Sequence, residues 1–177
     1  MKELLAHTKI FDLVQKDETM PGFRPVAIEA PDWVSVIAEC DGKFMMTRQV
    51  RHGVGKAVDE FVCGTVEKGE MPESAAFREL AEETGLVVDH GAFRHLGTVS
   101  PNPAFMTNEM HVFYVNLDEA VFFTDKPNPG EHERLTSRWT DKAEVFRSVF
   151  SPNDGEVVPA MKMCAVALYR DMVAAGA

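Results

Sequence analysis

One segment constrains the fold of this 177-residue chain more than any other, a glutamate-rich stretch enclosed by glycines between Gly64 and Leu86. Pro72 is favourable near the start of a helix, and Gly85 is a natural stop because glycine adopts the left-handed conformation easily. Between them, apolar residues stand at positions 76, 77, 80 and 81, the spacing of one buried helical stripe. The segment therefore predicts a helix over residues 73–84 that packs on a core.

Three glutamates share one patch of this predicted helix. Glu79 lies one turn from both Glu82 and Glu83, and like charges at that spacing destabilise a helix. A divalent cation would offset the repulsion, because Mg²⁺ and Mn²⁺ prefer clustered carboxylate oxygens. Glycines let the preceding loop turn closely, so we expect the carbonyl of Cys63 to face the same ion. The alternative is a solvated acidic face, which is the common interpretation of an isolated Glu-rich helix.

Arg78 stands beside these glutamates in the sequence. It can pair with Glu70 or orient one of the carboxylates, which is the usual role of residues that support metal ligands from behind. We count Arg78 among the catalytic candidates, together with Glu82, and expect the pair with Glu70 to support the site.

The spacing of these residues carries a family resemblance. Gly64 is followed by five residues and Glu70, then by seven residues and the run RELAEETGL from position 78. This is the full signature of the Nudix hydrolase family, which the chain resembles. The resemblance implies a Nudix-type α/β/α sandwich with a mixed sheet, in which the signature forms a loop–helix–loop. It also implies hydrolysis of a nucleoside diphosphate linked to another group, with metals that make the attacking water more acidic.

The remaining sequence alternates between strand and helix signals. β-branched runs predict strands at 33–38 and 44–50, joined by the turn signal Asp41-Gly42. Shorter runs predict strands at 60–63, 93–100, 110–117 and 135–140, a loop at 52–58, and helices at 141–150 and 157–174. This order indicates a mixed α/β or α+β sandwich and not a repeating βαβ chain. We expect residues 1–30 to be an N-terminal strand region and residues 31–177 to be the Nudix domain.

The amino-acid composition restricts the classes of partner that this chain is expected to bind. The 28 acidic and 18 basic residues give a formal net charge of −10, which would repel nucleic-acid phosphates. No apolar run approaches the roughly 20 residues that a membrane span needs, and charged residues appear too early for a secretory signal. The three cysteines are odd in number and lack CxxC spacing, which argues against a disulfide framework or a zinc site. We therefore expect a reduced, cytoplasmic protein that binds neither nucleic acid nor membrane.

Residues that flank the signature resemble the ADP-ribose and ADP-sugar pyrophosphatase branch of the family. The run RQVR at 48–51 is similar to the branch pattern RQ-x-R, and EFVCG at 60–64 is similar to E-aliphatic-P-A-G, with Val-Cys in place of Pro-Ala. Pro101 lies fifteen residues past the signature, as in the branch, although the segment that follows is longer and lacks the branch glycine. The resemblance implies a homodimer in which N-terminal strands cross between subunits, a part for which residues 1–30 are candidates.

Four residues are candidates for substrate binding. Arg51 can clamp a phosphate in bidentate fashion, and Arg48 is a second candidate. Phe105 and Met106 can close over a base or sugar, as apolar loop residues often do. The alternatives are a surface salt bridge for the arginines and plain packing for Phe105 and Met106.

The run KPNPGEHE at 126–133 resembles the polar loop that supplies a catalytic glutamate in this branch. A carboxylate on such a loop can approach metal-bound water. We expect Glu133 to be the general base, with Glu131 as second choice. His132 is the third, because an unperturbed histidine titrates near about 6.5. The alternative is an ordinary acidic loop.

The resemblance thus predicts metal-dependent hydrolysis of ADP-ribose or a related ADP-sugar to AMP and a sugar phosphate. Mg²⁺, or Mn²⁺, would be held by Glu79, Glu83 and the Cys63 carbonyl, with Glu82 contributing. Other substrates remain open, namely GDP-mannose, NADH or a dinucleoside polyphosphate. A protein of a different class, a Nudix-fold sensor that binds a nucleotide without cleaving it, is the remaining alternative.

Overall fold

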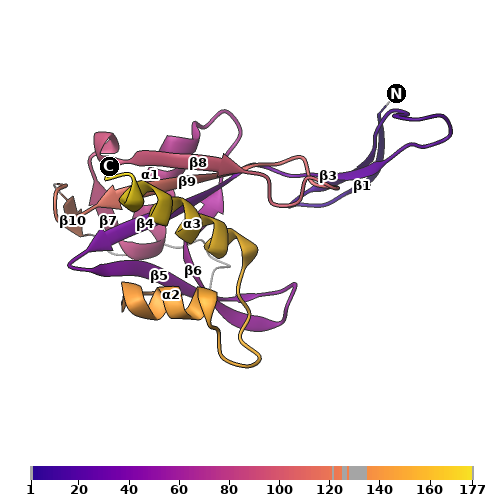
Figure 1. Ribbon diagram of the computed structural model, residues 1–177. Coiled ribbons are helices and arrows are strands. Elements are labelled where there is room, and N and C mark those ends of the chain that lie inside the picture. Colours follow the sequence, from indigo (N-terminus) through magenta and orange to yellow (C-terminus); the bar gives the residue numbers. More distant parts are fainter. Residues whose placement is uncertain (1, 121, 125–126, 128–134, 177) are drawn as a thin grey trace.

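The computed structural model shows a six-stranded mixed sheet with helices on both faces and a separate three-stranded arm (Figure 1). It describes residues 2–120, 122–124, 127 and 135–176. The spatial order in the large sheet is β11 (Leu135–Asp141), β5 (Lys43–Arg51), β6 (Lys56–Thr65), β4 (Trp33–Cys40), β9 (Met110–Asn116) and β8 (Arg94–Val99). β4 and β9 run parallel and the other neighbours run antiparallel. The predicted mixed sandwich is confirmed.

The β4–β5 hairpin forms as its turn signal predicts. Asp41 and Gly42 have φ angles of 47° and 70°, the left-handed pair that a tight type I′ hairpin requires. β6 differs from the prediction, because it begins at Lys56 instead of residue 60 and continues through Gly64. Its first half pairs with β5 and its second half with β4. This pairing outweighs the weak strand propensity of its charged and glycine positions.

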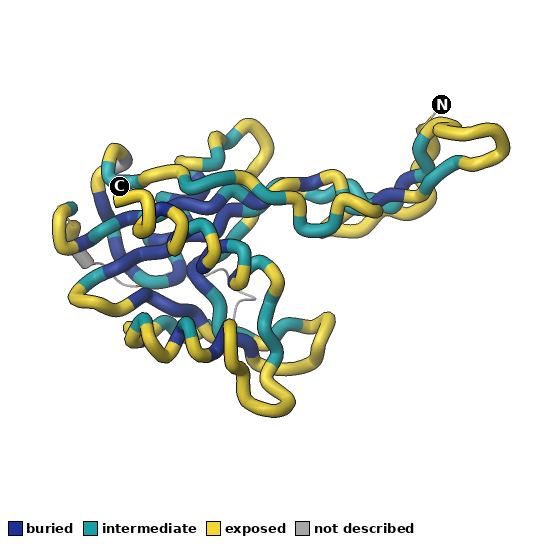
Figure 2. Tube along the Cα trace, viewed as in Figure 1, coloured by how far each residue is buried: buried dark blue, intermediate teal, exposed yellow. Residues whose placement is uncertain are grey.

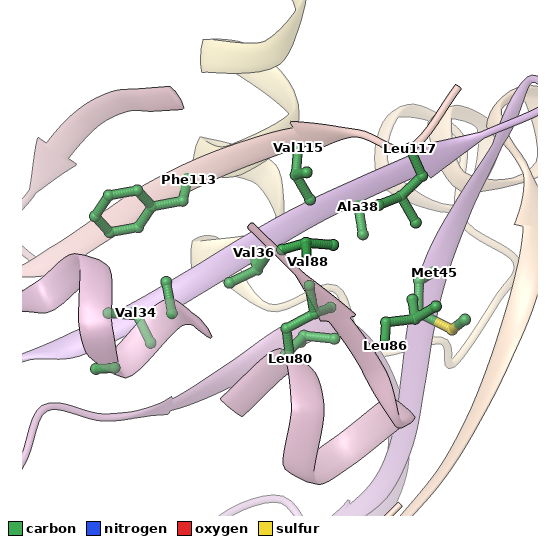
Figure 3. Close-up of a cluster of buried hydrophobic side chains, with 13 residues drawn as sticks. Val34, Val36, Ala38, Met45, Leu80, Leu86, Val88, Phe113, Val115 and Leu117 are labelled. Carbon is green, nitrogen blue, oxygen red and sulfur yellow. The ribbon is translucent and has the colours of Figure 1, made fainter. Parts of the chain in front are cut away.

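The helix α1 (Pro72–Thr84) covers one face of the large sheet, as the apolar stripe predicts. Gly85 ends it with φ 75°, and its N–H donates to the carbonyl of Ala81 at 2.8 Å. Leu80 is fully buried and packs with Val36 and Val88 in the core beneath the helix (Figure 3). This face of the sheet therefore fixes the position of the signature helix.

Two helices cover the opposite face, α2 (Lys142–Phe150) and α3 (Ala160–Ala174). Their core includes Phe44, whose ring meets that of Tyr169 edge to face at a centroid distance of 4.9 Å. No helix in the described part of the chain has the length and apolar character needed to cross a membrane. Three short elements have no counterpart in the predictions, because three residues carry no measurable period: β7 (Leu86–Val88), η1 (His90–Ala92) and β10 (Phe122–Thr124).

An arm of three antiparallel strands projects from the body (Figures 1 and 2). It contains β1 (Glu3–His7), β2 (Asp12–Gln15) and β3 (Val26–Glu29). The segment between β8 and β9 runs along β3, since the N–H of Ile28 donates to the carbonyl of Phe105 at 2.7 Å. Much of the arm's apolar surface is exposed, at Leu4, Leu5, Ile10, Phe11, Met20, Phe23 and Val26.

Candidate active site

The signature glutamates, Glu79, Glu82 and Glu83, differ in burial. Glu79 and Glu83 are 7% and 2% exposed, whereas the side chain of Glu82 is 43% exposed. The inner face of α1 carries these two carboxylates beside its alanines and Leu80. A buried carboxylate is costly unless it is paired or binds a cation. A solvated acidic face, the alternative considered from the sequence, therefore does not describe Glu79 or Glu83.

Gly64 is required by the close approach of Glu79 to the backbone of β6. A Cβ at position 64 would lie 1.9 Å from Cδ of Glu79 and 2.0 Å from its Oε1. The residue sits inside the strand, paired with Val34, so the predicted end of this strand at residue 63 is wrong. The turn glycine of this segment is Gly69, with φ 85°.

Arg78 joins three glutamates and one carbonyl. Its Nε and Nη2 donate to the two oxygens of Glu70, each at 3.0 Å, and Nη2 also donates to the carbonyl of Thr65 at 2.8 Å. Its Nη1 donates to Oε1 of Glu79 at 2.7 Å and to Oε2 of Glu82 at 3.4 Å. The hydrogen bonds from Arg78 lower the pKa of Glu70, and those to Glu70 and Glu79 raise the pKa of Arg78. The ion pair expected between Arg78 and Glu70 is present.

Glu83 reaches across to the residue before Gly64. The backbone N–H of Cys63 donates to its Oε2 at 3.3 Å. Burial, with the nearby Glu60 carboxylate adding to it, raises the pKa of the Cys63 thiol to about 12. The side chain is therefore a neutral thiol at pH 7, and the backbone of Cys63 lies beside the buried glutamates.

The donor set suits a hard divalent cation by its chemistry. Four carboxylates, at positions 70, 79, 82 and 83, belong to one short segment with the single guanidinium of Arg78. Surplus negative charge and oxygen donors are what Mg²⁺ and Mn²⁺ bind. In the described part of the chain, no group of three or more His, Cys, Asp or Glu side chains stands in metal-binding arrangement. Arg78 instead engages an oxygen of Glu79 and one of Glu82.

A cavity of about 520 Å³ opens beside Glu79 and Gly64, and we call it the Glu79 cavity. Arg51 and Glu60 supply its charged wall. Its apolar wall comes from four separate parts of the chain: Ile10 in the β1–β2 turn, Trp33 at the start of β4, Val58 in β6 and Met161 in α3. The cavity therefore combines charged groups for a phosphate with apolar surface for a larger organic group.

The two candidate arginines face opposite sides of the sheet. Arg51 lines the Glu79 cavity, and its Nε donates to Oε2 of Glu60 at 2.6 Å. Burial alone would lower the pKa of Arg51, but Glu60 outweighs it and raises that pKa. Arg48 donates instead to Oδ2 of Asp59 at 2.8 Å and lines a different cavity of about 340 Å³. Positions 48 and 51 differ in parity, and successive strand residues point to opposite faces.

Two further candidates, Phe105 and Met106, lie away from this cavity. Phe105 and Met106 lie against the arm, where Met106 pairs with Ile28 and Phe105 is 46% exposed. Neither lines the Glu79 cavity. The candidate bases Glu131, His132 and Glu133 lie outside the described residues, so their role stays a prediction.

Several residues of the cavity wall had no predicted role, and three of them are instructive: Glu60, Trp33 and Ile10. Glu60 stands in the quoted branch motif, and that motif was the signal that could have found it. Trp33 is the first residue of a predicted strand, and an aromatic ring at a strand end is a weak signal. Ile10 has no local signal at all, because only the folding of the arm places the β1–β2 turn beside β6.

Comparisons with known proteins identify a family model and related sequences. The family model described as "NUDIX domain" matches residues 30–161. The ADP-ribose pyrophosphatase of Bacillus subtilis is 33% identical over 116 residues, which are 63% of this chain and 62% of that protein. The ADP-sugar pyrophosphatase of Mus musculus is 34% identical over 89 residues, which are 50% of this chain and 41% of that protein. The chain thus spans about two fifths to three fifths of the length of these curated relatives.

A solved structure shares the fold. The crystal structure of an ADP compounds hydrolase superposes with a TM-score of 0.78 at 21% identity, covering 99% of this chain and 93% of that one. At this identity the likeness establishes the fold alone. The family model covers most of the chain, including the whole signature and every lining residue of the Glu79 cavity except Ile10, and the chain therefore belongs to the NUDIX domain family.

Proposed function

We propose that this protein is a metal-dependent hydrolase that cleaves the pyrophosphate of ADP-ribose or a related ADP-sugar, giving AMP and a sugar phosphate. The observation that carries the proposal is the pair of buried carboxylates on α1, Glu79 and Glu83, of which Glu79 lines a cavity that also presents Arg51. The names of the two curated relatives, an ADP-ribose and an ADP-sugar pyrophosphatase, support the choice of substrate.

The metal ligands in this proposal are Glu79, Glu82, Glu83 and the carbonyl of Cys63. A bound Mg²⁺ or Mn²⁺ polarises phosphate oxygens and lowers the pKa of water. Arg78 acts as a positioning residue, since it holds one oxygen of Glu79 and one of Glu82. This restricts the side-chain rotamers from which these carboxylates bind a cation.

In this proposal, Arg51 and the apolar wall of the Glu79 cavity bind the substrate. The Nε of Arg51 is used by Glu60, which fixes the plane of the guanidinium and leaves its terminal N–H groups for phosphate oxygens. Glu133 is the proposed general base, followed by Glu131 and then His132. Each would take a proton from water, which a carboxylate or a neutral imidazole can do.

We also propose a homodimer formed through the N-terminal arm, residues 1–30. Seven large apolar residues of the arm are exposed (Leu4, Leu5, Ile10, Phe11, Met20, Phe23 and Val26), and contiguous exposed apolar surface commonly marks a protein interface. Three free cysteines suit a reducing compartment such as the cytoplasm. Light scattering on the full chain tests the dimer, and a monomer at micromolar concentration would contradict it.

The first experiment is a turnover panel with ADP-ribose, ADP-glucose, GDP-mannose, NADH and a diadenosine polyphosphate. Released phosphomonoester is measured with a coupled phosphatase, in Mg²⁺ and in EDTA. We expect metal-dependent cleavage of an ADP-sugar above the others. Preference for another compound would overturn the substrate assignment, and saturable binding without turnover would favour the nucleotide sensor.

The two arginines provide a matched test of the site. We expect Arg51→Ala to raise KM for the ADP-sugar by about tenfold or more, because a charge-assisted hydrogen bond contributes about 1.5–3 kcal/mol. Arg48→Ala, on the opposite face, should change KM by less than about twofold, since exposed pairs contribute little. Equal effects of the two substitutions would contradict the proposed role of Arg51.

A further inference from the structure

A second cavity, of about 630 Å³, lies at the other end of α3 from the Glu79 cavity. Met161, in the first turn of α3, lines the Glu79 cavity, whereas Tyr169 and Met172 near its end line the second one. Figure 1 shows α3 crossing the sheet, so its two ends lie apart. The two cavities have no lining residue in common. We call the second one the tyrosine cavity, after Tyr114 and Tyr169.

Its floor is a hydrogen-bonded network around one buried carboxylate. Oε2 of Glu39 accepts from the hydroxyl of Tyr169 at 2.7 Å and from that of Tyr114 at 3.2 Å. Lys142 donates to Oε1 of Glu39 and to the hydroxyl of Tyr169. Burial, with Glu39 adding to it, raises the pKa of both phenols, so each stays a donor at neutral pH. The charges of Glu39 and Lys142 therefore balance within this floor.

Hydrogen-bond donors remain unused above this floor. Arg94 is the register partner of Tyr114 on the neighbouring strand, and it has no hydrogen bond or ion pair with the described residues. Lys142 has three N–H groups and uses two of them within the network. Asn116 accepts from the N–H of Asp118 through Oδ1, and its NH₂ group has no hydrogen bond with the residues that the structure describes. A guanidinium, an ammonium and an amide thus line one cavity.

Two further features of the lining indicate the chemistry of a ligand that would fit the cavity. Glu119 places an exposed carboxylate among the lining residues, which can accept from a hydroxyl group. Ala92, Ala120, Met172 and Val173 give the cavity an apolar wall. A ligand that matches all of these groups has an acceptor-rich anionic end and a carbon skeleton that bears hydroxyls.

We propose that the tyrosine cavity is a second binding site, for a phosphomonoester of a sugar or nucleoside. A phosphate has three terminal oxygens for the donors of Arg94, Lys142 and Asn116, whereas a carboxylate has two. The sugar hydroxyls are placed toward Glu119. The cavity stands on its own geometry, and only the choice of probes rests on the proposed function, whose products are phosphomonoesters.

The chain provides an unusually selective readout. It contains two tyrosines, and both line this cavity. Tyrosine labelled with carbon-13 in the ring therefore gives NMR signals that report on this cavity and not on the Glu79 cavity. The probes are ribose 5-phosphate, AMP and inorganic phosphate, each titrated into the 177-residue chain in EDTA. We expect ribose 5-phosphate or AMP to shift both tyrosine signals along a saturable curve.

Variants locate the contacts. Arg94→Ala should weaken ribose 5-phosphate binding by about tenfold or more, because it removes a charge-assisted hydrogen bond, and Arg94→Lys should recover part of the loss. Glu119→Gln should weaken the ribose 5-phosphate complex but not that of inorganic phosphate. Arg170→Ala is the matched control, since that arginine lies over the ring of Phe150 at 5.2 Å and is outside the cavity.

Three results would overturn the proposal. The first is that neither organic probe shifts the tyrosine signals at concentrations up to about 10 mM, because a specific small-ligand site has a lower dissociation constant than that. The second is that the probes shift the tyrosine signals of Arg94→Ala in the same way as those of the unaltered chain. The third is that inorganic phosphate binds as tightly as both organic probes, which would make the cavity a simple anion site. Binding is measured here without turnover, so failure of this proposal is distinguishable from failure of the hydrolase assignment.

Discussion

Two clusters of ionisable side chains in this molecule differ in their balance of carboxylates and hydrogen-bond donors. On α1, Arg78 is shared by the carboxylates of Glu70, Glu79 and Glu82. At the far end of α3, the single carboxylate of Glu39 is shared by one lysine and two tyrosines. The first cluster has more acceptors than donors, and the second has its carboxylate fully engaged.

This difference distinguishes a site that needs a bound cation from a network that stabilises the folded state. Surplus carboxylates repel one another, so the α1 cluster is stabilised by a bound divalent ion. The Glu39 network has no surplus charge, and removing one charged member leaves the other without its partner. Substitutions should therefore reduce activity in the first cluster and stability in the second.

The largest expected effect is on activity in the α1 cluster. Glu83→Gln should lower kcat with Mg²⁺ by more than about 100-fold, since loss of even an outer partner of a metal site costs about 10–100-fold. The melting temperature without metal should stay level or rise, because one repulsive charge is removed. Steady-state kinetics and calorimetry measure the two quantities.

Glu73→Gln is the control on the same helix, since Glu73 is an exposed residue of the first turn. It should keep both kcat and the melting temperature. A stable, fully active Glu83→Gln protein would remove the contrast between the two clusters.

A second prediction tests the fit between Gly64 and Glu79. Gly64→Ala would place a Cβ 1.9 Å from Cδ of Glu79, so the carboxylate must move. Misplacement by about 1 Å can lower kcat by about 100-fold, and this is the loss we expect in steady-state assays. Gly53→Ala is the control, because a Cβ there has no heavy atom within 4 Å. Retention of full activity in Gly64→Ala would show that the position of Glu79 is not critical.

The third prediction concerns stability in the Glu39 network. Glu39→Gln leaves the ammonium of Lys142 without its carboxylate and should lower the free energy of unfolding by about 2 kcal/mol, less than for a fully buried pair because Lys142 is partly exposed. For a chain of this size, that is about 4–8 °C in melting temperature. Glu119→Gln, in the lining of the same cavity, should leave the melting temperature unchanged. An unaltered melting temperature for Glu39→Gln would mean that the network does not stabilise the fold.

The smallest effect is a pH dependence of the same network. Burial alone would lower the pKa of Lys142, but its hydrogen bonds to Glu39 and Tyr169 outweigh burial and raise the pKa above the ordinary 10.5. A raised pKa stabilises the fold fully below the unfolded value, and the stabilisation is lost as pH rises through the folded value.

Lys142→Met should therefore differ from the unaltered chain in unfolding free energy at about pH 8, and the difference should narrow toward about pH 11. Urea unfolding at both pH values measures it. A difference that is constant with pH would exclude a charged role for Lys142.

Much of the fold was accessible from local sequence. The helix after Pro72, its stop at Gly85 and the hairpin at Asp41-Gly42 all form as predicted, because each depends on residues a few positions apart. The arm was predicted only as a short strand region, since its three strands are held by pairing with one another. The extension of β6 at both ends likewise depends on two neighbouring strands.

The candidate site was predictable in its residue types and less so in its placement. The signature correctly identified Arg78 and Glu70 as partners. Strand parity could have separated Arg51 from Arg48, because their side chains must point to opposite faces. The position of Phe105 against β3 could not be predicted, since it depends on pairing between segments about 77 residues apart, a separation with no local period.

The sequence by itself determined the signature, the family and the helix that carries three glutamates, because these are encoded in fixed spacings along one segment. Only the tertiary structure decided that Glu79 and Glu83 are buried, that Gly64 lies against Glu79, and that a second cavity exists. Lys142 and Tyr169 bond to Glu39 from 103 and 130 residues away. Contacts over such separations are fixed by the packing of α2 and α3 on the sheet, for which no short stretch of sequence carries a signal.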